Sequence, residues 1–320
     1  MKKSFFFLSI ALAATLFTGC QNRNRMPAFE LNEIPEAYYT PADQQGNVVT
    51  MTYSITADTG IVAKSAQVYL PYGYDATDTV PRYNVLYLAH GGNDNSRSFF
   101  DGSHGSLPLG QILDHLIASG KMQPLIVVGV TYYPDDSGRV HYGMKQTIDL
   151  CRDFHNELET TIIPAVGMAF PGTFLASADH DGIVASRQHR AYGGFSMGSL
   201  STWYQIINGL DVASAFIPLS GDCWIYDQGG QKISFDATAR IIDKKVVEQG
   251  YTKRDFRVFA LTGSKDVACG AETSLVEALA TEDAPNFVMD KNMTLKVLED
   301  GGHSYFFINR YLYNVLPVLF

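Results

Sequence analysis

Ser196 is the residue of this sequence that most directly suggests chemistry. It is the centre of Gly194-Phe195-Ser196-Met197-Gly198, where a short apolar run stops and a pattern typical of a helix begins. If the run is a buried strand, the serine lies on a turn so tight that only glycine fits two residues before and after it. Such a nucleophile elbow lifts the hydroxyl above the sheet. Because an ordinary glycine-rich turn has the same residues, a base, an acid and an oxyanion hole must be found elsewhere.

The base and the acid are expected among polar residues that follow later strands. A serine hydroxyl is a poor nucleophile until an imidazole takes its proton. Of the eight histidines, His303 is the best placed, because it follows the last expected strand and two glycines and precedes the terminal helix. Asp266 ends the preceding expected strand and would orient the imidazole, and Asp222, one strand earlier, is the alternative acid. The order Ser196, Asp266, His303 is that of α/β-hydrolases.

An oxyanion formed during the reaction needs N–H donors that are already in place. The N–H of Met197, directly after the serine, is one expected donor. The second is expected from Gly91 or Gly92 in the His90-Gly91-Gly92 loop, because glycine lets the backbone approach a substrate closely. These residues together predict acyl transfer by a serine nucleophile. No cofactor and no metal are expected, since no Cys/His pair has zinc spacing and the sequence has no EF-hand loop.

These residues must be positioned by a sheet, and the sequence predicts one. Apolar or alternating runs bounded by turn signals predict strands at 47–55, 65–70, 83–89, 125–131, 191–195, 215–219, 256–262 and 294–298. Helical spacing of apolar residues separates several of the later runs, as at 109–117, 148–162 and 200–207. Strands alternating with helices predict an α/β fold, with a mainly parallel central sheet, antiparallel N-terminal strands and helices on both faces. Together with the order of Ser196, Asp266 and His303, this points to the α/β-hydrolase fold. Ligands then bind beyond the carboxyl ends of the strands.

The N-terminus has the pattern of an export signal. Lys2 and Lys3 precede an apolar stretch too short to span a bilayer comfortably, and Phe17-Thr18-Gly19-Cys20 resembles a bacterial lipobox. We therefore expect a signal peptide at 1–19, a tether at 20–45 and one catalytic domain at 46–320. The protein is expected to be an exported lipoprotein of the bacterial cell envelope, with a lipid anchor on Cys20 as its contact with the membrane.

Composition excludes other classes of function. The formal net charge of −9 and the lack of lysine or arginine runs argue against nucleic acid as a partner.

The remaining cysteines are Cys151, Cys223 and Cys269, and export permits a disulfide. A bridge between Cys223 and Cys269, each just past an expected strand, is compatible with the sequence, and so are three free thiols.

The runs SRQHRAYGGFSMGSLSTWY, PLSGDCW, TGSKD and GGHSYFFINRYLYNVLPVLF resemble the feruloyl esterase modules attached to bacterial xylanases, in carbohydrate esterase family 1 of the esterase D-like α/β-hydrolases. The resemblance extends over about 53–320. It implies a triad of Ser196, Asp266 and His303 and an oxyanion hole made by Met197 with Gly91 or Gly92.

The resemblance also implies the substrate, a feruloylated plant polysaccharide or oligosaccharide such as xylan. Acetyl xylan esterase, with an acetylated polysaccharide as substrate, is the alternative, and a siderophore esterase is a more distant one. A flat feruloyl ring calls for an apolar slot open at one side. Trp224 and Tyr305 are expected to line it, with Phe99 and Phe100 as further candidates, although each of these aromatic residues is equally compatible with the core.

Overall fold

The computed structural model describes residues 25–57, 60–135 and 141–320. The predicted signal peptide, the lipidation site at Cys20 and the first residues of the predicted tether lie outside the described residues. Within the described ranges, no helix combines the length and the apolar character needed to cross a membrane.

A single eight-stranded sheet runs through the molecule, in the order β1-β2-β4-β3-β5-β6-β7-β8. β1 pairs antiparallel with β2, and β2 pairs antiparallel with β4, whereas the pairs from β4 to β8 are parallel. This confirms the predicted fold class. The strands are β1 Asn47–Ala57, β2 Gly60–Leu70, β3 Asn84–Ala89, β4 Leu125–Val130, β5 Arg190–Phe195, β6 Ala215–Leu219, β7 Arg257–Gly263 and β8 Met293–Leu298.

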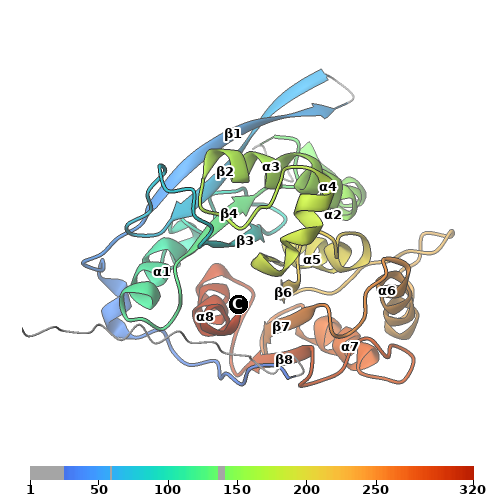
Figure 1. The fold of residues 1–320 in the computed structure, drawn as a ribbon. Helices are drawn as coiled ribbons and strands as arrows, with labels where there is room; N and C mark the ends of the chain where they lie inside the picture. Colours follow the sequence, from blue (N-terminus) through green and yellow to red (C-terminus); the bar gives the residue numbers. More distant parts are fainter. Residues whose placement is uncertain (1–24, 58–59, 136–140) are drawn as a thin grey trace, which may run out of the picture.

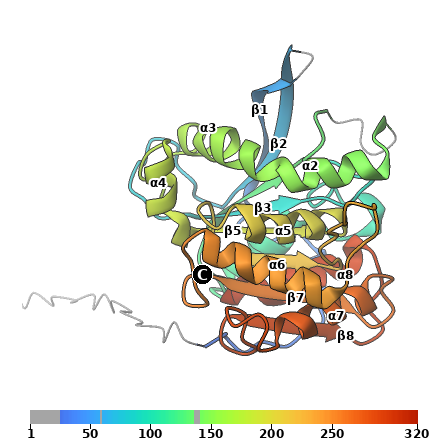
Figure 2. The ribbon, with the colours of Figure 1, turned by 90° about the vertical axis from the view of Figure 1, so that its right-hand side faces the viewer.

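Helices cover both faces of the sheet (Figures 1 and 2). α1 and α8 pack on one face and α2, α3, α5, α6 and α7 on the other. The α-helices are α1 Leu109–Ala118, α2 Met144–Glu157, α3 Ile163–Ala169, α4 His180–Ala185, α5 Met197–Asn208, α6 Phe235–Glu248, α7 Cys269–Leu279 and α8 Tyr305–Val315. The short helical turns are η1 Glu36–Tyr39, η2 Ser103–Gly105, the π-helix η4 Leu158–Ile162 between α2 and α3, η5 Arg187–His189 and η6 Leu316–Val318.

The central strands are apolar on both sides because each side meets a helical layer. In β3, Val85 and Tyr87 belong to the core under α2 and α5, while Leu86 and Leu88 belong to the core under α1 and α8. Successive side chains of a strand point to opposite faces of the sheet, so a strand that is buried on both faces shows a continuous apolar run. The parallel arrangement also collects the carboxyl ends of β3 to β8 along one edge, where ligands bind in such sheets.

The described part of the predicted tether, 25–45, packs along the domain. The N–H of Met26 donates to the carbonyl oxygen of Asp290 at 3.0 Å. Arg310 and Asn314 of α8 donate to the carbonyl oxygen of Asn32 at 3.1 and 2.9 Å. This segment thus covers part of the face that α8 would otherwise expose.

Candidate active site

Ser196 lies at the predicted elbow, between β5 and α5. Its φ of 57° is in the left-handed region that residues with a side chain rarely adopt. The flanking glycines are required by close packing: a Cβ on Gly194 would lie 2.6 Å from the carbonyl oxygen of Ala89, and one on Gly198 would lie 2.1 Å from it. The strained turn is therefore held by the fit of β5 and α5 against the end of β3.

Ser196, His303 and Asp266 form one hydrogen-bonded chain. Nε2 of His303 is 3.0 Å from Oγ of Ser196, and Nδ1 is 2.8 Å from Oδ1 of Asp266. The carboxylate of Asp266 is buried, and Oδ1 also accepts from the N–H of Ala268 at 2.7 Å. When Nδ1 donates to this carboxylate, Nε2 is left to accept the proton of the Ser196 hydroxyl. The fold thus brings together the three residues predicted from the sequence.

Asp222, the alternative acid, has other partners. Its Oδ1 accepts from Nε1 of Trp224 at 2.8 Å, and its Oδ2 pairs with Nζ of Lys232. Among the described residues no hydrogen bond or ion pair joins Asp222 to His303. The geometry therefore selects Asp266 as the residue that orients the imidazole.

The two glycines of the loop after β3 differ in whether their N–H groups have a partner. The N–H of Gly91 donates to Oη of Tyr305 at 3.2 Å, so this group is already used. The N–H groups of Gly92 and Met197 donate to none of the described residues, and Gly92 is partly exposed where Gly91 is buried. Of the two glycines left open by the sequence, Gly92 is the one with a donor to offer.

The predicted substrate-binding aromatics divide into two groups. Trp224 is partly exposed and packs against the core along one side. Tyr305, Phe99 and Phe100 are 2%, 1% and 9% exposed, which corrects the expectation that they line an open slot. Phe99 meets Tyr305 edge to face at 5.2 Å between ring centroids. The apolar side chains that follow the loop are covered because they form the core beneath it.

His90 supports the loop after β3, a role that was not expected from the sequence. It is fully buried, with Nδ1 2.7 Å from the carbonyl oxygen of Gly91 and Nε2 2.8 Å from Oγ1 of Thr131. Burial, with the nearby charge of Lys64, lowers the pKa of His90 to about 4, so the ring is neutral near pH 7. The sequence signal for this role is the position of His90 directly before Gly91 and Gly92. The hydrogen bond from its Nδ1 holds the carbonyl group of Gly91 in place.

Glu272, on α7, is the other residue that sequence reasoning missed. Its Oε2 accepts from the N–H of Gly221 at 3.1 Å, and Oε1 has no hydrogen-bond partner among the described residues. Burial, aided by the charges of Asp266 and Asp222, raises the pKa of Glu272 well above its usual range. The signal was present, since Glu272 stands at helical spacing from the buried residues Leu275, Val276 and Leu279.

The remaining predictions concern metals and thiols. Within the described ranges, no group of three or more His, Cys, Asp or Glu side chains is arranged to hold a metal ion. Cys151, Cys223 and Cys269 are all free thiols, so the bridge between Cys223 and Cys269 is not formed.

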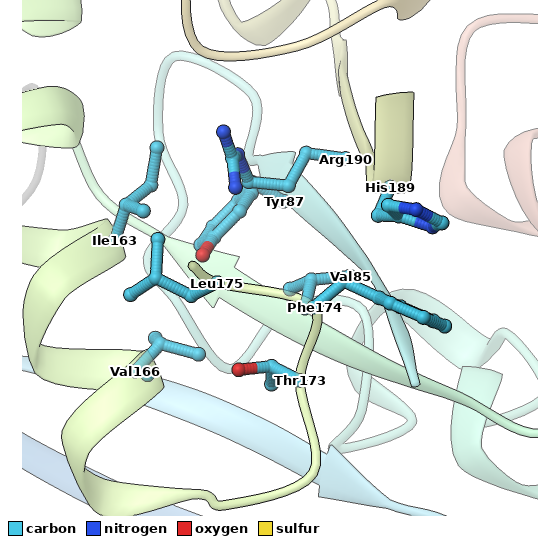
Figure 3. A pocket seen from close by; sticks show the side chains of 10 residues that line it. Val85, Tyr87, Ile163, Val166, Thr173, Phe174, Leu175, His189 and Arg190 are labelled. Atoms are coloured by element: carbon cyan, nitrogen blue, oxygen red, sulfur yellow. The ribbon is translucent and has the colours of Figure 1, made fainter. Parts of the chain in front are cut away.

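Two hollows lie away from the triad. The first, of ≈ 10 Å³, is at the amino ends of β3 and β5, where Tyr87 and Leu175 point toward each other (Figure 3). Such a volume suits no more than one water molecule. The second, of ≈ 170 Å³, lies between β2 and the residues after β4, and is lined by Thr52, Ala63, Lys64, Ser65, Thr131 and Asp135. Neither is lined by Ser196, His303 or Asp266.

Comparisons with known proteins show which proteins this chain resembles, although no family model matches it. Endo-1,4-beta-xylanase Y of Acetivibrio thermocellus is 35% identical over 297 residues, which are 92% of this chain and 25% of that protein. Endo-1,4-beta-xylanase/feruloyl esterase of Xylanibacter ruminicola is 34% identical over 159 residues, 49% of this chain and 19% of that protein. The chain thus spans about a quarter or less of the length of these relatives.

One solved structure covers a single module. It is a serine-to-alanine mutant of the feruloyl esterase module from Clostridium thermocellum, complexed with sinapinate. That module is 34% identical, and the alignment, with a TM-score of 0.76, covers 92% of this chain and 95% of the module. Because the match takes in almost the whole of both chains, this protein belongs to the feruloyl esterases, serine carboxylic ester hydrolases of the α/β-hydrolase fold.

Proposed function

We propose that the protein hydrolyses feruloyl esters of plant xylan through an acyl-enzyme on Ser196. The observation that carries the proposal is the chain of hydrogen bonds from Asp266 through His303 to Ser196. It stands at the carboxyl edge of the sheet, on a serine held in a strained and partly exposed turn. A nucleophile with an adjacent base, itself oriented by a carboxylate, is the arrangement that acyl transfer requires.

Each step of the reaction has a residue of this chain to perform it. Oγ of Ser196 attacks the ester carbonyl carbon while Nε2 of His303 takes the hydroxyl proton, and Asp266 stabilises the imidazolium. The N–H groups of Met197 and Gly92 are the proposed donors to the oxyanion. His303 then gives its proton to the departing sugar oxygen, which leaves the acyl group on Ser196. Water, deprotonated by His303, releases the acid by the same route in reverse.

Trp224 is the proposed contact for the feruloyl ring. Its indole N–H is tied to Asp222, and the Nζ atom of Lys232 lies 5.7 Å from the ring centroid, so the side chain is held in one orientation. A partly exposed, fixed aromatic face suits a planar cinnamoyl group. The complex of the related module with sinapinate, another hydroxycinnamate, supports this class of acid.

Location is also a proposal. The N-terminal sequence favours export and lipidation of Cys20, which would place the enzyme in the cell envelope, at the periplasm or the cell surface. Labelling of expressed protein with a palmitate analogue tests this. The wild type is expected to be labelled and the Cys20→Ser variant is not. An unlabelled wild type would contradict the proposed lipidation.

The substrate proposal is tested with the wild-type enzyme on methyl ferulate, p-nitrophenyl acetate and feruloylated and acetylated xylan. Release of ferulate from both feruloyl substrates is expected. Cleavage of acetylated xylan without cleavage of methyl ferulate would move the assignment to an acetyl xylan esterase. Cleavage of a catecholate siderophore ester alone would move it to a siderophore esterase.

A further inference from the structure

His104 forms a hydrogen bond with Asp94 of the loop after β3, outside the triad. Nε2 of His104 is 2.9 Å from Oδ1 of Asp94. The Asp94 side chain is largely covered, at 12% exposed, whereas that of His104 is half exposed. The reaction steps above use neither residue, so the pair calls for its own explanation.

Asp94 ties the loop to the first residue of α8. Oη of Tyr305 donates to Oδ2 of Asp94 at 3.2 Å and accepts from the N–H of Gly91 at 3.2 Å. The N–H of Asp94 in turn donates to the carbonyl oxygen of Gly91 at 3.2 Å. A Cβ on Gly91 would lie 2.7 Å from Oδ2 of Asp94. The Gly91 backbone is therefore clamped by Asp94 and Tyr305, and the next N–H in the chain is that of Gly92.

His104 is held in an unfavourable backbone conformation. Its φ is 63°, between Gly102 at 66° and Gly105 at 69°, although only the glycines adopt such values without strain. Its ring stacks on Tyr305, with centroids 5.3 Å apart and planes at 18°. Strain of this kind persists where surrounding contacts over-determine it. Here these contacts are the hydrogen bond with Asp94 and the stack on Tyr305.

We propose that His104 is a positioning residue for the oxyanion hole. It fixes Asp94 by the hydrogen bond and Tyr305 by stacking. These two residues clamp Gly91, and the N–H of Gly92 is thereby presented to the substrate. The inference rests on the proposed function, since an oxyanion forms only if the site cleaves esters.

His104→Ala tests the proposal, because alanine removes the ring and keeps a side chain at the strained position. Misplacing one oxyanion donor should lower kcat about tenfold on both methyl ferulate and p-nitrophenyl acetate, with KM changed less than about twofold. The matched control is His180→Ala, which removes another exposed histidine paired with a carboxylate, Glu159, at 2.6 Å. The control should keep the kcat of the wild type. An unchanged kcat in His104→Ala, or a rise in KM confined to methyl ferulate, contradicts the proposal.

A double-mutant cycle with Asp94→Asn shows whether His104 acts through Asp94. If it does, adding His104→Ala to Asp94→Asn should cost far less than His104→Ala alone, because the shared path is already broken. Independent, multiplying losses would mean that His104 acts by another route and would overturn the inference.

Amide hydrogen exchange at Gly91 reads the same positioning without catalysis. The Gly91 N–H is expected to exchange about tenfold faster in His104→Ala than in the wild type or in His180→Ala, because the clamp is loosened locally. Unchanged exchange contradicts the inference whether or not the enzyme cleaves esters. A wild type that cleaves no ester contradicts the proposed function instead.

Discussion

Glu272 accepts a hydrogen bond from the N–H of Gly221 at 3.1 Å, and the Glu272 side chain is completely buried. The carbonyl oxygen of Gly221 accepts in turn from Oγ of Ser199 at 2.7 Å and from Nε1 of Trp203 at 3.0 Å, both on α5. A carboxyl group on α7 thus supports the loop after β6, and that loop supports the helix that begins at the elbow. Burial, with the nearby charges of Asp266 and Asp222, raises the pKa of this carboxyl, so the fold disfavours its charged form.

Glu272→Gln should therefore keep the esterase activity and change the dependence of stability on pH. A carboxyl whose folded pKa is raised contributes stability that is fully present below its usual value of 4.5 and is lost as the pH rises. The free energy of unfolding of Glu272→Gln relative to the wild type should increase as the pH rises above 4.5. Urea titrations from pH 4 to 8 measure it. Glu277→Gln, on the exposed side of the same helix, is the control, and parallel curves for Glu272→Gln and the wild type would refute this account.

The stability that His90 contributes should depend on pH in the opposite direction to that of Glu272. Its folded pKa of about 4 is below its usual 6.5, so the stability it contributes is present above 6.5 and is lost as the pH falls toward 4. At roughly 1.4 kcal/mol for each tenfold change in proton affinity, the loss reaches about 3 kcal/mol below pH 4. In His90→Gln this part of the acid destabilisation should disappear, whereas His115→Gln should keep it. Equal acid slopes for His90→Gln and the wild type would show that His90 is not buried as a neutral ring.

Substitutions of Asp222, after β6, and Asp266, after β7, should affect different substrates. Asp266→Asn should lower kcat about 10⁴-fold on every ester, because the imidazole would take the wrong tautomer. Asp222→Asn should weaken the hold on Trp224 and lower kcat/KM on methyl ferulate, with little change on p-nitrophenyl acetate. Steady-state kinetics on both esters decide this. Larger losses in Asp222→Asn than in Asp266→Asn, on both esters, would mean that the acid has been misassigned.

Trp224→Ala should distinguish a substrate contact from a core residue. Aromatic contact is worth about 0.5 to 1.5 kcal/mol beyond area burial, and the buried area adds more. The variant should therefore lower kcat/KM for methyl ferulate roughly tenfold to a hundredfold and affect p-nitrophenyl acetate much less. Equal losses on both esters, with a lower Tm, would assign Trp224 to the core.

The parts of the fold that sequence could predict are those set by one strong local constraint. The elbow was readable because Gly194 and Gly198 must both be glycine to pack against Ala89. The buried strands were readable as apolar runs. β2 was predicted too short, at 65–70, because the residues from Gly60 to Ala63 are largely exposed and do not alternate between apolar and polar side chains. The edge shared by Ser196, Asp266 and His303 then follows from parallel strands alone.

The sequence could not predict the features that are set by the orientation of side chains around a loop. Tyr305 and Phe99 follow site residues in the chain, yet their rings pack beneath the loop after β3 and not in an open slot. The choice between Gly91 and Gly92 depends on a hydrogen bond from Gly91 to Tyr305, which lies 214 residues away in the sequence. No periodicity or local propensity encodes a contact of that separation.

Turnover of methyl ferulate by Ser196→Ala tests the central claim most directly. Since nucleophile, base and acid act as a unit, the loss of Oγ should reduce kcat on the order of 10⁵-fold. The variant should remain folded, with a near-UV circular dichroism spectrum like that of the wild type, because His303 is the only hydrogen-bond partner of the Ser196 side chain among the described residues. A folded Ser196→Ala enzyme that turns over methyl ferulate at close to the wild-type rate would contradict the assignment of Ser196 as the nucleophile.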